Sequence, residues 1–152
     1  ISLKMALINN DETNFKHFIS EEGPLSSNIG DNKFISINQN LNGNEMIDFY
    51  HEIDLLFAPI ATPGISRMAL EAMSCGTPVI MLDNEDRTPL VDKVTGFLLD
   101  SKNLNIEDKM GYFLDNSKLI SEISFNCRKE IVNNFSKKII MPQIENIYKS
   151  II

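Results

Sequence analysis

The sequence predicts an α/β domain in which helices cover both faces of a parallel β-sheet. Short apolar runs alternate with helix-like runs over about the first hundred residues, which is the pattern of such a sheet. The run 55–58 (LLFA) is continuously apolar, as in strands that are buried on both faces. A length of 152 residues with 43% hydrophobic residues suffices for one core, so we expect a single domain over 1–152.

The first third of the chain is predicted to form a strand, a helix and a second strand. These elements span 3–8, 12–20 and 33–38, and a loop with Gly, Pro and Ser residues at 23–30 separates the last two. A further helix is predicted to begin at Asn44, because Asn is a common N-cap residue. Its apolar residues have the spacing of one buried helix face: Met46, Phe49, Tyr50 and Ile53.

The apolar strand is predicted to lead through a loop into a short helix. Pro59, Pro63 and Gly64 mark the loop. The helix is predicted over 66–74, and Gly76 is placed to end it, because Gly adopts the left-handed conformation that terminates many helices.

The second half of the chain is predicted to add two strands, at 78–82 and 95–99, and then only helices. These helices are expected at 106–114, 118–134 and 137–151. Pro142 is expected to kink or restart the last one, because proline has no N–H for the helical hydrogen bond.

The bulk composition narrows the possible partners. A net charge of −7 argues against binding to nucleic acid or anionic lipid, because phosphate-rich surfaces would be repelled. Cys75 and Cys127 are interpreted as reduced thiols of a cytoplasmic protein, and no apolar run is long enough to cross a bilayer. His17 and His51 lack metal-ligand spacing, so no metal site is expected. Any phosphate must therefore be bound locally.

The loop at 60–65 offers a local anion site. It follows the carboxyl end of a predicted parallel strand, which is where ligands bind in open α/β sheets. It also leads directly into a helix, whose first backbone amides lack intrahelical partners and whose dipole makes that end partly positive. Gly64 would let a diphosphate come close to the backbone.

Three segments carry a resemblance to a known family: 54–59 (DLLFAP), 70–80 (LEAMSCGTPVI) and 95–98 (TGFL). Together they resemble the C-terminal donor-binding domain of group 1 (family 4) retaining glycosyltransferases of the GT-B fold. The resemblance implies a Rossmann-like three-layer α/β/α domain that binds a nucleoside-diphosphate sugar. It implies transfer to a glycan, lipid-linked or small-molecule acceptor, as in polysaccharide biosynthesis, with no cofactor or metal required.

The resemblance also implies which residues bind the donor. They are Gly64, Ile65, Ser66, Arg67 and Glu71. Glu71 matches the second of two family glutamates, which holds the ribose hydroxyls. The first glutamate falls at Pro63, which has neither a carboxylate nor an N–H. The resemblance assigns no catalytic residue in this chain. The amides of residues 64–67 are expected at the phosphates, aided by the Ser66 hydroxyl and the Arg67 charge.

Other features depart from the family pattern and leave alternatives open. The acidic run 84–86 replaces a Gly-Gly pair, and the family's basic pair would precede the first strand. We therefore expect that an N-terminal acceptor-binding domain and the first part of the donor-binding domain lie outside the sequence. From this chain alone we expect weak donor binding and no activity. That domain could place the enzyme at a membrane surface. A non-catalytic binding or scaffolding relative is the main alternative, favoured by Pro63, and a sugar-nucleotide epimerase is a third. Arg67 and Glu71, four apart on one helix, could also be a simple surface ion pair.

Overall fold

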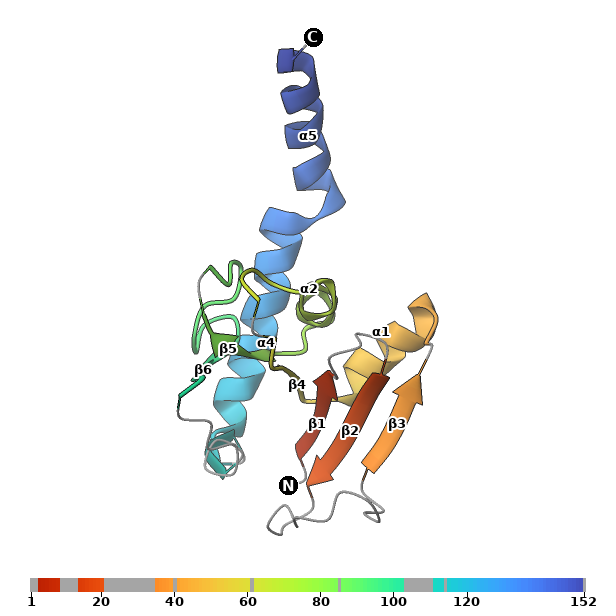
Figure 1. The fold of residues 1–152 in the computed structure, drawn as a ribbon, viewed down its shortest axis with the longest axis vertical. Coiled ribbons are helices and arrows are strands. Elements are labelled where there is room, and N and C mark those ends of the chain that lie inside the picture. The colour runs from red at the N-terminus through yellow and green to blue at the C-terminus, as the bar shows by residue number, and fades with distance from the viewer. Residues whose placement is uncertain are drawn as a thin grey trace.

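The computed structural model describes residues 3–8, 14–20, 35–39, 41–60, 62–84, 86–102, 111–113 and 115–151. Within them, the strands are β1 (Leu3–Ile8), β2 (Asn14–Ser20), β3 (Ile35–Gln39), β4 (Leu55–Ala58), β5 (Val79–Asp83) and β6 (Phe97–Asp100). They form one sheet of order β3-β2-β1-β4-β5-β6 (Figure 1). Parallel pairing joins β1 to β4, β4 to β5 and β5 to β6, which confirms the predicted α/β class.

The N-terminal edge of the sheet differs from the prediction. Strand β2 runs antiparallel between β1 and β3, so the helix predicted at 12–20 is wrong. Phe15, Phe18 and Ile19 have helical spacing, but aromatic and β-branched residues also favour strands, and here pairing with β1 and β3 decides. The strand predicted at 33–38 is confirmed as β3, and the predicted loop at 23–30 lies outside the described residues.

Helix α1 (Gly43–Glu52) has its N-cap two residues before the predicted one. Its N-cap is Asn42, whose side chain accepts hydrogen bonds from the amides of Asn44 and Glu45. The Glu45 carboxylate in turn accepts a hydrogen bond from the Asn42 amide at 2.8 Å, which completes a capping box. The prediction of Asn44 as N-cap is therefore wrong, because only Asn42 has a Glu three residues later. The predicted apolar face is confirmed, with Tyr50 buried in the core.

Strand β4 is buried on both faces, as its unbroken apolar sequence predicts. Leu56 and Ala58 belong to a core that they share with α1 and with α2 (Arg67–Cys75). Leu55 and Phe57 face the other way, into a second core that includes Phe113. Because successive strand residues point to opposite faces, one short strand anchors both layers and fixes where the following loop leaves the sheet.

The C-terminal part is helical, and the predicted break between the helices at 118–134 and 137–151 is confirmed. Residues 111–113 are helical, and the rest of the helix predicted at 106–114 lies outside the described residues. Helix α4 (Ser117–Glu130) continues into a π-helical turn (Ile131–Phe135) before α5 (Lys137–Ile151). The prediction of a restart at Pro142 is wrong, since α5 runs through it and the break lies at Ser136, whose backbone is extended.

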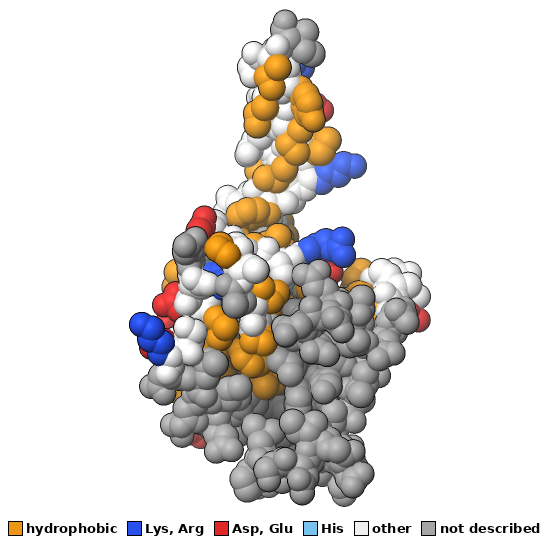
Figure 2. All heavy atoms as spheres, in the orientation of Figure 1, with side chains coloured by type: hydrophobic (Ala, Val, Ile, Leu, Met, Phe, Trp, Pro, Cys, Tyr) orange, Lys and Arg blue, Asp and Glu red, His pale blue; other side chains and the backbone are white. Residues whose placement is uncertain are grey.

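Helix α5 extends away from the sheet as an isolated arm (Figure 1). None of its described residues is buried, and apolar side chains run along it in a stripe (Figure 2). Its solvent-exposed backbone explains why Pro142 is tolerated, because water can bond the carbonyl that the proline leaves without a partner. Among the described helices, none is both long enough and apolar enough to cross a bilayer.

Candidate functional site

The loop between β4 and α2 has the conformation that the sequence predicts. Gly64 has φ of +89°, a left-handed backbone that other residues adopt only with strain. A Cβ placed on Gly64 would meet nothing within 4 Å, so a larger residue would fit there. Glycine is favoured at this position because of its backbone conformation. Ser66 caps α2 with its hydroxyl, which accepts a hydrogen bond from the Ala69 amide at 3.1 Å. Gly76 ends the helix with φ of +84°, as predicted.

The amides at the start of α2 are left without intramolecular partners, with one exception. Those of Ile65, Ser66, Arg67 and Met68 meet no hydrogen-bond acceptor in the part of the chain that the structure describes. The Gly64 amide, which the sequence placed with them, instead donates to the Asp86 carbonyl at 3.1 Å. The predicted cluster of unpaired amides is therefore correct from residue 65 onward and wrong at Gly64.

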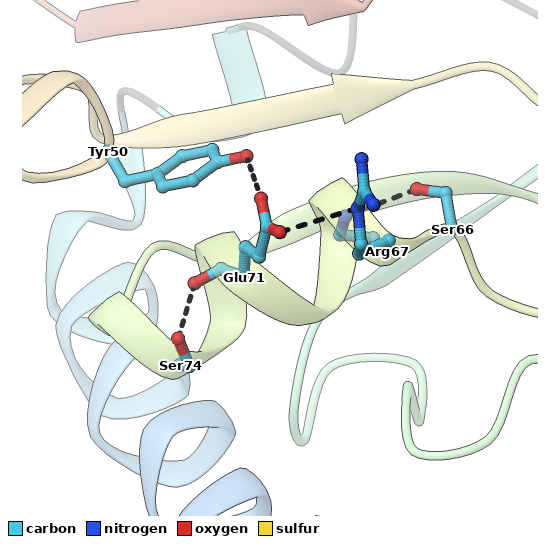
Figure 3. Close-up of polar contacts among 6 residues, drawn as sticks. Tyr50, Ser66, Arg67, Glu71 and Ser74 are labelled. Carbon is cyan, nitrogen blue, oxygen red and sulfur yellow. Dashed lines mark hydrogen bonds and ion pairs between the residues drawn. The ribbon is translucent and has the colours of Figure 1, made fainter. Parts of the chain in front are cut away.

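Glu71 lies one turn further along α2, with both carboxylate oxygens in contact with neighbours (Figure 3). Oε1 is 3.5 Å from Nε of Arg67, which confirms the i,i+4 ion pair. Oε2 accepts a hydrogen bond from the Tyr50 hydroxyl at 3.3 Å. The side chain of Glu71 is still 45% exposed. A carboxylate accepts about four hydrogen bonds, so it keeps capacity for further donors.

Tyr50 is a part of the site that sequence reasoning assigned only to the core. Burial and, next, the charge of Glu71 raise the pKa of Tyr50 well above its ordinary value, so its hydroxyl stays protonated and acts as a donor. Thr77 holds the backbone of the same residue, because its hydroxyl donates to the Tyr50 carbonyl at 2.6 Å. The sequence could have indicated this role, because a tyrosine predicted to be buried needs a polar partner for its hydroxyl. In the structure this partner is Glu71.

Arg87 was missed altogether, and it connects the loop after β5 to the loop after β4. It is 3% exposed, and its guanidinium donates to one backbone carbonyl in β5 and to three in the loop after β4. The adjacent Asp86 is exposed, and hydrogen bonds from Thr88 hold the pKa of its carboxyl below the usual value. Asn84 is exposed as well, so the acidic run lies largely in solvent, as predicted, although Glu85 is outside the described residues.

The remaining candidates play no part in this site. Cys75 is half-buried and Cys127 is buried, and both are free thiols. Burial raises the pKa of the Cys127 thiol to about 12, which makes it unreactive near neutral pH. His51 is exposed on α1, and His17 lies on β2 and not on the predicted helix. The described residues contain no group of three or more potential metal ligands.

Comparisons with known proteins show the family of this chain. A family model described as "Glycosyl transferases group 1" matches residues 18–116. The capsular polysaccharide biosynthesis glycosyltransferase CapM of Staphylococcus aureus is 25% identical over 135 residues, which cover 82% of this chain and 35% of CapM. The chain thus spans about a third of the length of this curated relative.

A solved structure shares the fold. It is the C-terminal domain of the group 1 glycosyl transferase LpcC from Francisella tularensis, with a TM-score of 0.56 and 24% identity. The likeness covers 66% of this chain and 52% of that one, and it confirms the predicted Rossmann-like α/β domain of the GT-B type. Because the family model matches more than half of the chain, the protein belongs to the group 1 glycosyltransferases.

Proposed function

We propose that this domain binds a nucleoside-diphosphate sugar and supports the retaining transfer of its sugar to an acceptor. The observation that carries the proposal is the pairing of unpartnered amides at residues 65–68 with the half-exposed carboxylate of Glu71 on the same helix. Arg67 and Glu71 are four positions apart on the helix, or about 6 Å along its axis. That spacing suits a ligand that carries phosphates at one end and a ribose next to them.

The phosphates would be held mainly by backbone. The first turn of α2 contains no acidic residue, so nothing there opposes the partial positive charge of the helix end. Arg67 adds a full positive charge at the first helical position, with a side chain that is 86% exposed and free to turn toward a ligand. The Ser66 hydroxyl already accepts from Ala69, and its proton can still be donated to a phosphate oxygen. An acidic protein can thus bind an anion at this one place.

The ribose would be held by Glu71. Tyr50 contacts one carboxylate oxygen and fixes the direction of the side chain, while Arg67, which contacts the other oxygen, can turn to the phosphates. The remaining lone pairs can accept hydrogen bonds from two adjacent sugar hydroxyls. A carboxylate is preferred over an amide for this task, because hydrogen bonds to a charged acceptor are shorter and stronger.

In this proposal the domain stabilises the departing diphosphate and supplies no covalent nucleophile. Amides that already point at the developing charge lower the barrier without reorganising during the reaction. The acceptor and any catalytic base would come from a separate acceptor-binding domain, and neither a metal nor a cofactor is needed. The name of the relative CapM, which refers to capsular polysaccharide biosynthesis, favours a glycan acceptor.

A second function is favoured by Pro63. This residue is exposed beside the unpaired amides and offers no carboxylate to a donor sugar. A relative that keeps nucleotide binding, or only the fold, while it has lost catalysis would show this replacement. The second candidate is therefore a non-catalytic glycosyltransferase-like domain with a binding or scaffolding role.

Titration calorimetry of the full-length protein with UDP, GDP and ADP tests both candidates. The donor-site proposal expects binding of at least one nucleotide and its loss in Glu71→Ala. Glu122→Ala is a matched control, because Glu122 is an exposed glutamate on α4 and should leave binding unchanged. No binding of any nucleotide would remove the donor site. Release of nucleoside diphosphate from a sugar donor then separates the transferase from the non-catalytic relative.

A further inference from the structure

Arg87 fixes the path of the β4–α2 loop through the loop's backbone. Its Nε donates to the Leu82 carbonyl at 3.0 Å, at the end of β5. Its two terminal nitrogens reach the other loop: Nη1 donates to the carbonyls of Thr62, at 2.7 Å, and of Gly64, and Nη2 donates to that of Ile60 at 2.8 Å. Only a planar guanidinium offers several donors in a fixed fork, so one side chain sets the conformation of the loop before α2.

The bond from Arg87 to the Gly64 carbonyl determines where the next amide points. The Gly64 carbonyl and the Ile65 N–H belong to one trans peptide plane, in which the two groups point in opposite directions. Because the carbonyl points at the guanidinium, the Ile65 N–H points away from it. This amide is the first of the four that have no acceptor among the described residues. Arg87 therefore turns one phosphate-binding amide outward.

The charge of Arg87 is not balanced by a carboxylate in the part of the chain that the structure describes. The ion pair found there joins Arg67 to Glu71, and the partners of Arg87 are neutral backbone carbonyls. A buried cation without a counter-charge is costly, and an anion nearby reduces that cost. One peptide plane separates this cation from the outward Ile65 amide, so a diphosphate on that amide would experience the field of Arg87 with little screening.

We propose that Arg87 is a positioning residue that makes this site select nucleoside diphosphates over nucleoside monophosphates. It orients the Ile65 amide and keeps a buried positive charge behind the loop, and both act on the second phosphate group more than on the base or the ribose. The inference rests on the proposed donor site. The inference also means that Arg87, which directly follows the acidic run 84–86, supplies positive charge to the loop between β4 and α2.

Calorimetry of the full-length protein tests the inference with three pairs of probes: UDP and UMP, GDP and GMP, and ADP and AMP. For the base that the wild type prefers, we expect the diphosphate to bind at least about tenfold more tightly than the monophosphate, since each charge-assisted hydrogen bond is strong. Arg87→Met should bring this ratio close to one. Arg87→Lys, which keeps a charge without the fork, should retain part of it.

Arg128→Met is the matched control. Arg128 also donates to a backbone carbonyl, that of Ser74 at the opposite end of α2, and its replacement changes the net charge equally. This variant should keep the wild-type ratio. The ratio does not depend on the fraction of folded protein, so partial unfolding of Arg87→Met does not obscure it. If Arg87→Met does not fold at all, the ratio measured for Arg87→Lys tests the inference instead.

The outcomes separate the inference from the proposed function. A ratio within about twofold of wild type in the Arg87 variants contradicts the inference. An equal loss of affinity for both nucleotides also contradicts it, because it indicates a structural role alone. If wild type binds a diphosphate and Glu71→Ala abolishes binding, the donor site stands whatever Arg87 does. If wild type binds no nucleotide, the donor site fails and the inference fails with it.

Discussion

The hydroxyl of Tyr50 donates a hydrogen bond to Oε2 of Glu71 at 3.3 Å and so joins α1 to α2 at the candidate site (Figure 3). Tyr50 is held rigidly, because it is 1% exposed and Thr77 bonds its carbonyl. Glu71 is half-exposed and has a long side chain that would otherwise sample several rotamers. The contact therefore orders the more mobile partner.

Tyr50→Phe should weaken nucleotide binding while it preserves the fold. The phenyl ring keeps the packing, and the lost hydrogen bond costs about 1 kcal/mol, which corresponds to about fivefold in affinity if it acts by ordering Glu71. Titration of the preferred nucleoside diphosphate measures the effect. Tyr148→Phe is the matched control, because it removes an exposed tyrosine hydroxyl from α5 and should leave binding unchanged. An unchanged affinity in Tyr50→Phe would show that the hydrogen bond to Glu71 does not order that side chain for binding.

Arg67→Ala should change the free energy of unfolding by less than about 0.5 kcal/mol, because exposed i,i+4 ion pairs contribute little. The side chain of Arg67 is 86% exposed and 3.5 Å from its partner, so the pair is weak. Donor affinity should nevertheless fall, and its dependence on salt should become shallower, because one cation is removed from the phosphate end. Urea unfolding and nucleotide titrations at two salt concentrations check the two parts. A large stability loss with unchanged affinity would assign Arg67 to structure.

Helix α2 could be predicted from the sequence because its signals are local. Ser66 and Gly76 are residue types that start and stop helices, and the structure uses both in that way. Strand β2 could not be predicted in the same way, because its residues also fit a helix and its pairing with β1 and β3 is a long-range choice. Local chemistry thus located the site, and the sheet edge depended on partners elsewhere in the chain.

Arg87 shows why part of the site could not be read from residue types. The acceptors that hold its side chain across the two loops are the carbonyls of Ile60, Thr62 and Gly64. Every residue has a carbonyl, so no side chain in that loop signals the contact. Resemblance to the family did point to Glu71, whose carboxylate the structure places in contact with the side chains of Arg67 and Tyr50. Whether it contacts a ribose stays a prediction.

Gly96→Ala should destabilise the protein by about 3 kcal/mol, because overpacking against backbone cannot relax easily. A Cβ at Gly96 would lie 2.7 Å from the Val79 carbonyl oxygen and 2.8 Å from Cγ of Leu90. Denaturant unfolding of the full-length protein measures the change. Gly43→Ala is the control, since Gly43 starts α1 and a Cβ there meets nothing within 4 Å. It should be neutral or slightly stabilising, and a similar loss in both variants would contradict the steric explanation.

Cys127 should make stability depend on pH above about 9, because its ordinary pKa is 9.0 and burial raises the folded value to about 12. Between these values the unfolded chain releases the thiol proton and the folded one keeps it. The contribution of Cys127 is therefore fully present below pH 9 and is lost as pH rises toward 12, by about 1.4 kcal/mol per pH unit. Burial raises the pKa of Tyr50 as well, but Tyr50 is present in both wild type and Cys127→Ala. Its contribution therefore cancels in the difference between their free energies of unfolding.

The stability gap between wild type and Cys127→Ala should accordingly narrow by about 1 kcal/mol from pH 7 to pH 10 in urea unfolding. At pH 7 the variant is less stable, because it loses packing at a fully buried position. Ile123→Val is the matched control: Ile123 is equally buried on α4, and the change removes a methyl group without removing a titratable group. Its gap to wild type should stay constant over the same range. A constant gap for Cys127→Ala as well would mean that the thiol ionises as readily in the folded protein as in the unfolded one, which its burial between α2 and α4 opposes.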